Sequence, residues 1–259
     1  MGEENKNNKN NKSVTIGIIV VIIMAIIGGG AFFLNSYLTN RDLEQPGQEL
    51  GYDIFIGDPD LPVTTSVDEG RDLKDELSKI NTTYIDAKAW LKVPGTSIDG
   101  PIFQSTDNST YYRNDRDTIE TKWGENFLDY RNNIKELSKS MMNIIIYGHN
   151  TETDNRFTPL LNYKKQEFYN THKYIEFATE DGVHTYEIFS VYSTDTKFYY
   201  IDTVFENESE YSDFVASLAK KSRYSTGVEI SVSDSILTLS TCDYSIKNGR
   251  FVVQAKLVK

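Results

Sequence analysis

DSILTLSTCDYSIKNGRFVVQAKLVK, Asp234–Lys259, is the stretch that decides how this chain folds. It contains two apolar runs, 234–242 and 250–259, and the polar connection between them ends in Asn248-Gly249. Apolar runs of this length that alternate with polar residues are typical of β-strands, and Asn-Gly is a strong turn signal. The stretch therefore predicts two neighbouring strands joined by a turn.

Cys242, at the end of the first run, is the only cysteine among 259 residues. A single cysteine excludes an internal disulfide framework and a zinc site built on cysteine pairs. A lone thiol is most often a small buried apolar group. Side chains alternate faces along a strand, so Leu237 and Leu239 face the core while Cys242 shares the opposite, more polar face with Ser240. This placement favours a functional thiol over a buried one.

Arg250 begins the second run, and it lies across from the neighbourhood of Cys242 if the two strands pair. A guanidinium beside a thiol can favour the thiolate or stabilise a developing oxyanion. The alternative is an arginine that caps a hairpin in water. The sequence leaves both possibilities open at this point.

A nucleophilic thiol usually needs a base nearby, and the chain has three histidines. His172 lies in a polar turn and His184 at the start of a strand, where we expect both to meet solvent. His149 ends the segment NIIIYGHN (143–150), where a strand buried on both faces gives way to a loop. Such strand ends often hold functional residues, so His149 is the candidate base. The spacing of the histidines predicts no metal site.

The rest of the chain beyond residue 66 predicts a mainly β domain, either a mostly antiparallel barrel or a sandwich. Short strands are expected in AWLKVPG, IDGPIFQ, NFLDYR, YIEFAT and VHTYEIFSVYS, with a hairpin turn at Glu180-Asp181-Gly182. Helical spacing of apolar residues predicts one helix around 73–80 and another over 208–223, just before the cysteine strand.

Residues 14–34 form an uncharged apolar run long enough to cross a bilayer as a helix. Lys6, Lys9 and Lys12 precede it, which predicts a cytoplasmic N-terminus and an extracellular body. A cleaved signal peptide is the alternative, but its apolar region is usually shorter. We expect a cytoplasmic tail at 1–13, a transmembrane anchor at 14–36, an extracellular linker at 37–66 and a catalytic domain at 67–259. The net charge of −11 argues against nucleic-acid binding.

At its chemical motifs the sequence resembles the class B sortases, membrane-anchored cysteine transpeptidases of Gram-positive bacteria. The resemblance covers roughly residues 70–259 and rests on several motifs in order: DGPIFQSTDNSTYYRND, NFLDYRNN, NIIIYGHNT, the helix before the cysteine strand, and TLSTC followed by an arginine. It implies a closed eight-stranded β-barrel with N-terminal helices.

The resemblance also implies roles for residues of the matched motifs. Cys242 would be the nucleophile, His149 the general acid and base, and Arg250 the group that stabilises the oxyanion or orients the substrate. Ser240 and Asp243, which flank the nucleophile, would line the substrate groove. The resemblance implies no cofactor and no metal.

The activity implied is cleavage of a C-terminal sorting motif, NPxTx- or LPxTG-like, after its threonine in secreted proteins. The acyl group would then pass to an amine of the lipid-linked peptidoglycan precursor, which fixes the protein to the cell wall. Three alternatives stay open: a pilin lysine as acceptor, hydrolysis by a plain cysteine endopeptidase, or a membrane-tethered binding module without catalysis.

Overall fold

The computed structural model describes residues 71–258, except 138, 152 and 154. The predicted tail, anchor and linker, over 1–66, lie outside the described residues. Within the described part of the chain, no helix has both the length and the apolar character needed to cross a bilayer.

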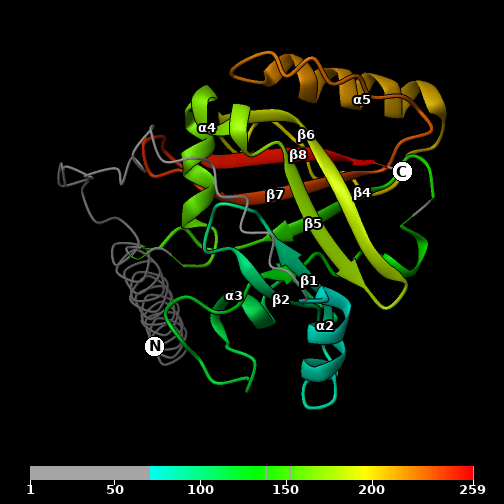
Figure 1. The fold of residues 1–259 in the computed structure, drawn as a ribbon. Helices are drawn as coiled ribbons and strands as arrows, with labels where there is room; N and C mark the ends of the chain where they lie inside the picture. Colours follow the sequence, from blue (N-terminus) through cyan, green and yellow to red (C-terminus); the bar gives the residue numbers. More distant parts are fainter. Residues whose placement is uncertain (1–70, 138, 152, 154, 259) are drawn as a thin grey trace, which may run out of the picture. The chain divides into compact units, whose positions relative to one another are not determined.

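Eight strands and several short helices make up the described chain (Figure 1). The strands are β1 (Ala87–Lys92), β2 (Asp99–Phe103), β3 (Phe127–Leu128), β4 (Asn143–Tyr147), β5 (Tyr174–Thr179), β6 (Gly182–Thr194), β7 (Ile236–Cys242) and β8 (Arg250–Val258). The helices are α2 (Leu73–Asn81), α3 (Thr110–Arg113), α4 (Gln166–Thr171) and α5 (Glu208–Lys221), with 3-10 turns η1 (Ile134–Glu136) and η2 (Thr158–Lys164).

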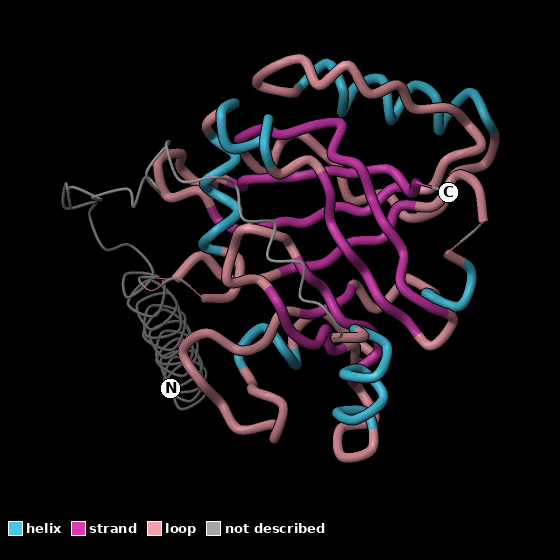
Figure 2. Tube along the Cα trace, viewed as in Figure 1, coloured by secondary structure: helices cyan, strands magenta, loops and turns pink. Residues whose placement is uncertain are grey.

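The strands close into a barrel in the order β1-β2-β3-β4-β7-β8-β6-β5. Six of the eight pairings among the described strands are antiparallel, while β2 with β3 and β4 with β7 run parallel. Figure 2 shows the strands, in magenta, grouped together with helices and loops around them. The prediction of a mainly β, closed eight-stranded barrel is confirmed for the described residues.

The two faces of β7 are buried in different places, as its alternation predicts. Leu237 and Leu239 belong to the core inside the barrel, where each contributes on the order of 2 kcal/mol by leaving water. Ile236 packs instead into the cluster beneath α5. Neighbouring β4 places Ile144 and Ile146 in the barrel core and is buried on both faces.

Helix α5 covers the outer face of the barrel near β6 (Figure 1). The side chain of Asn207 caps its first turn by accepting a hydrogen bond from the Glu210 amide. Tyr211, Val215 and Leu218 recur at helical spacing and form its buried face. The segment between β6 and α5 contributes Tyr200 to the same cluster as Ile236, so it lies over the outer face of β7, which carries Ser240 and Cys242.

The strand predicted over 126–131 is shorter than its pattern suggests. Only Phe127 and Leu128 are in the sheet. The Asp129 amide still donates to the Ile145 carbonyl of β4, and its buried carboxylate accepts hydrogen bonds from the backbone and the guanidinium of Arg131, where the chain turns away from the sheet. The same carboxylate also supports the wall of the candidate site described below.

Candidate active site

Parallel pairing of β4 with β7 brings His149 and Cys242 to the same end of the barrel. The register pairs Tyr147 with Ser240, and the Gly148 amide continues it with a hydrogen bond to the Ser240 carbonyl. Two residues beyond this pair the chain reaches His149 on one side and Cys242 on the other. The Asn150 side chain donates to the Cys242 carbonyl at 3.0 Å, which keeps the two strand ends together.

Antiparallel pairing of β7 with β8 sets Arg250 directly across from Cys242. The connection closes through Asn248, whose φ of 54° lies in the left-handed region that asparagine tolerates, as the Asn-Gly signal indicates. His149, Cys242 and Arg250 thus lie at neighbouring ends of β4, β7 and β8, although 93 positions separate His149 from Cys242 in the sequence.

A cavity of about 190 Å³ opens at these strand ends. The predicted residues Cys242, His149, Arg250 and Ser240 all line it. The remaining lining residues are Asn108, Tyr112, Phe127, Tyr147, Gly148 and Thr241. The structure therefore brings together four of the five residues named from the sequence.

The thiol of Cys242 is partly buried, and its electrostatics favour the protonated form. Burial raises the pKa of Cys242, and the charge of Asp243 acts in the same direction. The guanidinium of Arg250 lowers this pKa without reversing the shift. The resting site therefore holds a thiol whose ionised form depends on Arg250 for stabilisation.

The imidazole of His149 is buried, with 7% of the residue exposed. Burial lowers the pKa of His149, and the positive charges of Arg113 and Arg156 act in the same direction. A hydrogen bond to the Tyr112 carbonyl, at 2.8 Å from Nε2, partly offsets them. The other two histidines do not line the cavity: His172 stacks on Phe168, and His184 is half-buried in β6.

Ser240 contributes to the cavity from the outer face of β7. Its hydroxyl lies 2.7 Å from the Tyr200 hydroxyl, in the segment that runs from β6 to α5. Asn143, at the start of β4, donates to the backbone carbonyls of Tyr200 and Asp202. These contacts fix the segment over the strand that carries the thiol.

Asp243 is not among the residues that line this cavity, and its place in the substrate groove stays a prediction. Its carboxylate is buried and accepts hydrogen bonds from Ser193, Ser245 and Lys164, the last also an ion pair at 2.9 Å. Burial alone would raise its pKa, but these bonds outweigh burial and lower the pKa to about 2. The residue ties the β7–β8 connection to η2 and β6, which is a structural role.

Two cavity walls, Asn108 and Tyr147, were not singled out from the sequence. Both donate hydrogen bonds to the carboxylate of Asp129, at 3.1 Å and 2.9 Å. Arg131 holds the same carboxylate and also donates to the Ile201 carbonyl. The motifs DNSTYYR, NFLDYR and NIIIYGHN, which contain these residues, were visible in the sequence, but nothing local indicates that one carboxylate joins them.

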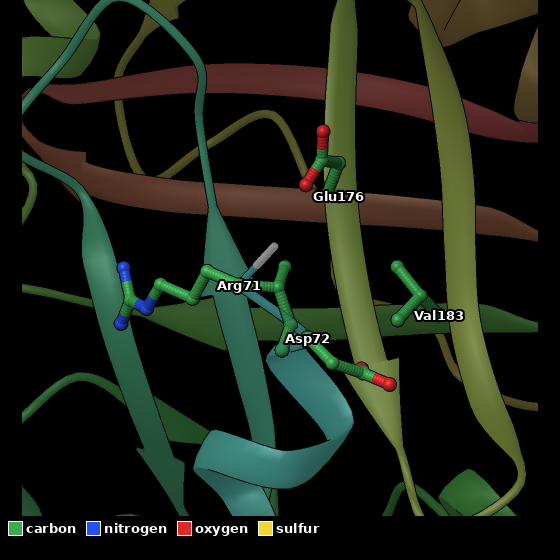
Figure 3. A pocket seen from close by; sticks show the side chains of 5 residues that line it. Arg71, Asp72, Glu176 and Val183 are labelled. Atoms are coloured by element: carbon green, nitrogen blue, oxygen red, sulfur yellow. The ribbon is translucent and has the colours of Figure 1, made fainter. Parts of the chain in front are cut away.

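A second, wider hollow of about 460 Å³ lies beside the start of α2 (Figure 3). It is lined by Arg71, Asp72, Leu73, Glu176 and Val183. Its lining includes neither a thiol nor an imidazole, and Arg71 is engaged with Asp99 at 2.6 Å. The chemistry of the described residues therefore concentrates at the smaller cavity. Among those residues, no cluster of three or more His, Cys, Asp or Glu side chains forms a metal site.

Comparison with known proteins agrees with this geometry. Residues 91–258 match the model of the sortase domain family. Sortase B of Staphylococcus aureus is 38% identical over 187 residues, which cover 71% of this chain and 74% of the relative. Sortase B of Listeria monocytogenes is 40% identical over 191 residues, which cover 72% and 76%.

Solved structures of sortase B share the fold as well. The Staphylococcus aureus sortase B–substrate complex superposes with a TM-score of 0.67 at 36% identity, covering 74% of this chain and 88% of that one. Sortase B complexed with triglycine gives the same TM-score and identity, with coverage of 74% and 89%. The family match over 91–258 includes the strands that carry the thiol, the imidazole and the guanidinium, and the chain belongs to the sortase family as a class B cysteine transpeptidase.

Proposed function

We propose that Cys242 is the nucleophile of this transpeptidase, His149 its general acid and base, and Arg250 the group that stabilises the oxyanion. The observation that carries the proposal is the convergence of the three side chains on one cavity through the β4–β7 and β7–β8 pairings. Arg250 uses one donor on the Gly249 carbonyl, and a guanidinium has five, so donors remain for a substrate oxygen.

The reaction follows from these positions. The Sγ of Cys242 attacks the carbonyl carbon of the threonine in a sorting motif and passes its proton to His149. The imidazolium returns this proton to the leaving amine as the carbon–nitrogen bond breaks, which leaves a thioester on Cys242. An incoming amine then attacks the thioester carbonyl, and His149 takes the proton that this amine loses. The carbon–sulfur bond breaks, and the imidazolium returns the proton to the Sγ of Cys242, which restores the resting thiol. The guanidinium of Arg250 opposes the charge on the oxyanion in both steps.

The substrates proposed are secreted proteins with an NPxTx- or LPxTG-like motif near the C-terminus, cleaved after threonine. The acceptor proposed is an amine of the lipid-linked peptidoglycan precursor, so that the product is fixed to the cell wall. Relatives have been solved as a substrate complex and with triglycine, a short peptide with a free amine. The apolar run at 14–34 supports a membrane-anchored enzyme with its catalytic domain outside the cell.

Incubation with a library of sorting peptides tests the substrate and the acceptor together. The full-length chain in mild detergent would be given peptides of both motif classes with triglycine, with a lysine side-chain amine, or with no acceptor, and products identified by mass spectrometry. We expect cleavage after threonine and a product ligated to triglycine. A product on lysine alone would favour pilin polymerisation, and hydrolysis unaffected by either amine would identify an endopeptidase.

The pKa directions predict a broad bell-shaped pH profile of kcat/KM. The lowered pKa of His149 keeps its imidazole neutral to lower pH, so the acid limb should fall below the ordinary histidine range. The raised pKa of Cys242 keeps the thiol protonated to higher pH, so the alkaline limb should fall above the ordinary cysteine range. Initial rates at subsaturating peptide over a wide pH range measure both limbs. A narrow profile centred on either ordinary value would contradict the prediction.

Arg250→Ala provides the matched test of the alkaline limb. The guanidinium favours the thiolate, so its removal should move this limb to still higher pH. Loss of an oxyanion donor should also lower kcat by about 10²-fold. Arg223→Ala, at an exposed arginine beyond the end of α5, is the control and should change neither quantity. If the alkaline limb of Arg250→Ala stays at the wild-type pH, Arg250 does not stabilise the thiolate.

A further inference from the structure

The hydrogen bond of His149 identifies which of its two ring nitrogens carries the proton. Nε2 lies 2.8 Å from the backbone oxygen of Tyr112. A carbonyl oxygen can only accept, so Nε2 must be the donor in the neutral as well as the protonated ring. The lone pair of neutral His149 is then on Nδ1. Proton exchange with Cys242 and with a leaving amine therefore falls to Nδ1.

The Tyr112 carbonyl is available because it lies in a helix too short to use it. Helix α3 has four residues, and the carbonyls at a helix end need partners from elsewhere. The three neighbouring carbonyls take backbone amides: Thr110 from Asn114, Tyr111 from Glu125, and Arg113 from Thr121. The Tyr112 carbonyl takes the imidazole.

The segment 121–125 holds this carbonyl in place from both sides. Its first and last residues, Thr121 and Glu125, donate to the carbonyls that flank Tyr112. Gly124 lies between them with a φ of 51°, in the left-handed region. A Cβ on Gly124 would collide with the Tyr111 carbonyl and would approach the Tyr112 carbonyl oxygen to 2.7 Å. The segment can therefore lie this close to α3 only because residue 124 lacks a side chain.

The same segment also contacts the rest of His149. The Trp123 ring meets the imidazole edge-on at 5.7 Å, while the Tyr112 ring lies over it at 4.6 Å. Buried Glu125 forms an ion pair at 2.7 Å with Arg156, in the loop that follows β4. The Phe157 amide, next along this loop, donates to the backbone carbonyl of His149. One short segment thus contacts the ring of His149 and anchors the loop behind it.

We propose that the segment 121–125, through Gly124, is a positioning element that holds the Tyr112 carbonyl as the fixed partner of His149 Nε2 and so directs Nδ1 to the reaction. A nucleophile, a base and a third group that orients the base form the usual arrangement of a triad. Here a backbone carbonyl is the orienting group. The inference rests on the proposed role of His149 as acid and base.

Nitrogen NMR on the full-length chain with labelled histidine tests the tautomer directly. His149→Gln assigns the His149 signals among the three histidines. In the wild type we expect the Nε2–H tautomer to predominate above the pKa of the ring. A predominant Nδ1–H tautomer in the wild type would overturn the proposal, and this measurement does not depend on activity or on a Gly124 variant.

Gly124→Ala tests the positioning element, with Gly227→Ala as its matched control. Gly227 also has a left-handed φ, of 73°, but a Cβ there would meet nothing within 4 Å. Both variants therefore carry similar backbone strain, and only the first displaces the Tyr112 carbonyl. We expect the Nδ1–H tautomer to gain population in Gly124→Ala and kcat to fall about 10- to 100-fold, since a misplacement of about 1 Å costs on that order. Gly227→Ala should retain the wild-type tautomer and rate.

The pH profile separates positioning from general loosening of the fold. The groups that face the His149 ring are the positive charges of Arg113 and Arg156, the Tyr112 carbonyl, and the Cys242 thiol and Arg250 across the cavity. The carbonyl favours the protonated ring, so its displacement in Gly124→Ala should move the acid limb to lower pH. If Gly124→Ala lowers the rate but leaves the acid limb and the tautomer of His149 unchanged, Gly124 serves only the stability of the fold. A different result would separate the two proposals. If His149→Ala keeps full activity while the wild type shows the expected tautomer, the proposed catalytic role of His149 is wrong, although the contact of Nε2 with the Tyr112 carbonyl is correct.

Discussion

Cys242→Ala is expected to lower transpeptidation by about 10⁴-fold or more and to abolish the thioester intermediate. No other thiol exists in the chain, so no neighbouring group can replace the nucleophile. Removal of a covalent nucleophile typically reduces a rate to what binding and oxyanion stabilisation supply by themselves. The measurement is intact-protein mass spectrometry of the acyl-enzyme, together with the rate of ligation to triglycine.

The fold should survive this change. Cys242 is the last residue of β7 and partly exposed, so its truncation leaves no sealed cavity. The free energy of unfolding, measured by thermal denaturation, should change by no more than about 1 kcal/mol. Cys242→Ser is the matched control for shape, since it keeps the size of the side chain and replaces only the sulfur. Retention of more than a trace of ligation by the alanine variant would contradict the assignment of the nucleophile.

Asp129→Ala is expected to lower the free energy of unfolding by about 3–5 kcal/mol. Its carboxylate is fully buried and accepts five hydrogen bonds, from Asn108, Tyr147 and three groups of Arg131. Burial by itself would raise the pKa of Asp129, but the bonds from Arg131 and Tyr147 outweigh it and hold the pKa below the usual range. Removing the buried carboxylate leaves Asn108 and Tyr147 without their acceptor and takes the carboxylate partner from Arg131, which is 30% exposed, and the loss of such a network costs on this order.

Denaturant unfolding at pH 7 measures the loss, and Asp213→Ala on the exposed face of α5 is the matched control. A lowered carboxyl pKa stabilises the fold above the unfolded pKa, and this contribution is lost as the pH falls through the folded pKa. The difference between wild type and Asp129→Ala should therefore shrink towards strongly acid pH. A loss at pH 7 no larger than that of the control would refute the argument.

The same variant should also impair catalysis at temperatures where it remains folded. Asn108 and Tyr147 line the cavity and owe their orientation to Asp129. The guanidinium of Arg131 loses its carboxylate partner as well, and with it a support for the segment over Ser240. We expect kcat/KM to fall with most of the effect in KM, since these side chains form walls and do not touch the proposed proton path.

Local patterns predicted the parts of the site that lie along one strand or one turn. Alternation placed Cys242 and Ser240 on the outer face of β7, and the Asn-Gly signal placed Arg250 opposite the thiol. Both depend on neighbouring residues, because side-chain direction and turn geometry are set within a few positions. The contacts of Asp243 could not be predicted, for the complementary reason. Its partner Lys164 is 79 positions away, and no local pattern reveals that contact.

The walls of the cavity could not be predicted in the same way. Asn108 and Tyr112 belong to one motif and Tyr147 to another, and Asn108 and Tyr147 meet at the buried carboxylate of Asp129. Their motifs matched the family, but a motif gives no direction for a side chain. The position of Gly124 against α3 likewise depends on a close approach of two backbones that periodicity does not report.

By itself the sequence determined the strands, the single nucleophilic candidate and the family that its motifs resemble. Only the tertiary structure decided that β4 runs parallel to β7 with Tyr147 beside Ser240, which sets His149 beside Cys242. It also decided that a backbone carbonyl engages Nε2 of that histidine. The physical reason is that strand register and close backbone packing arise from contacts between residues far apart in the chain, whereas a sequence pattern records only the preferences of neighbours.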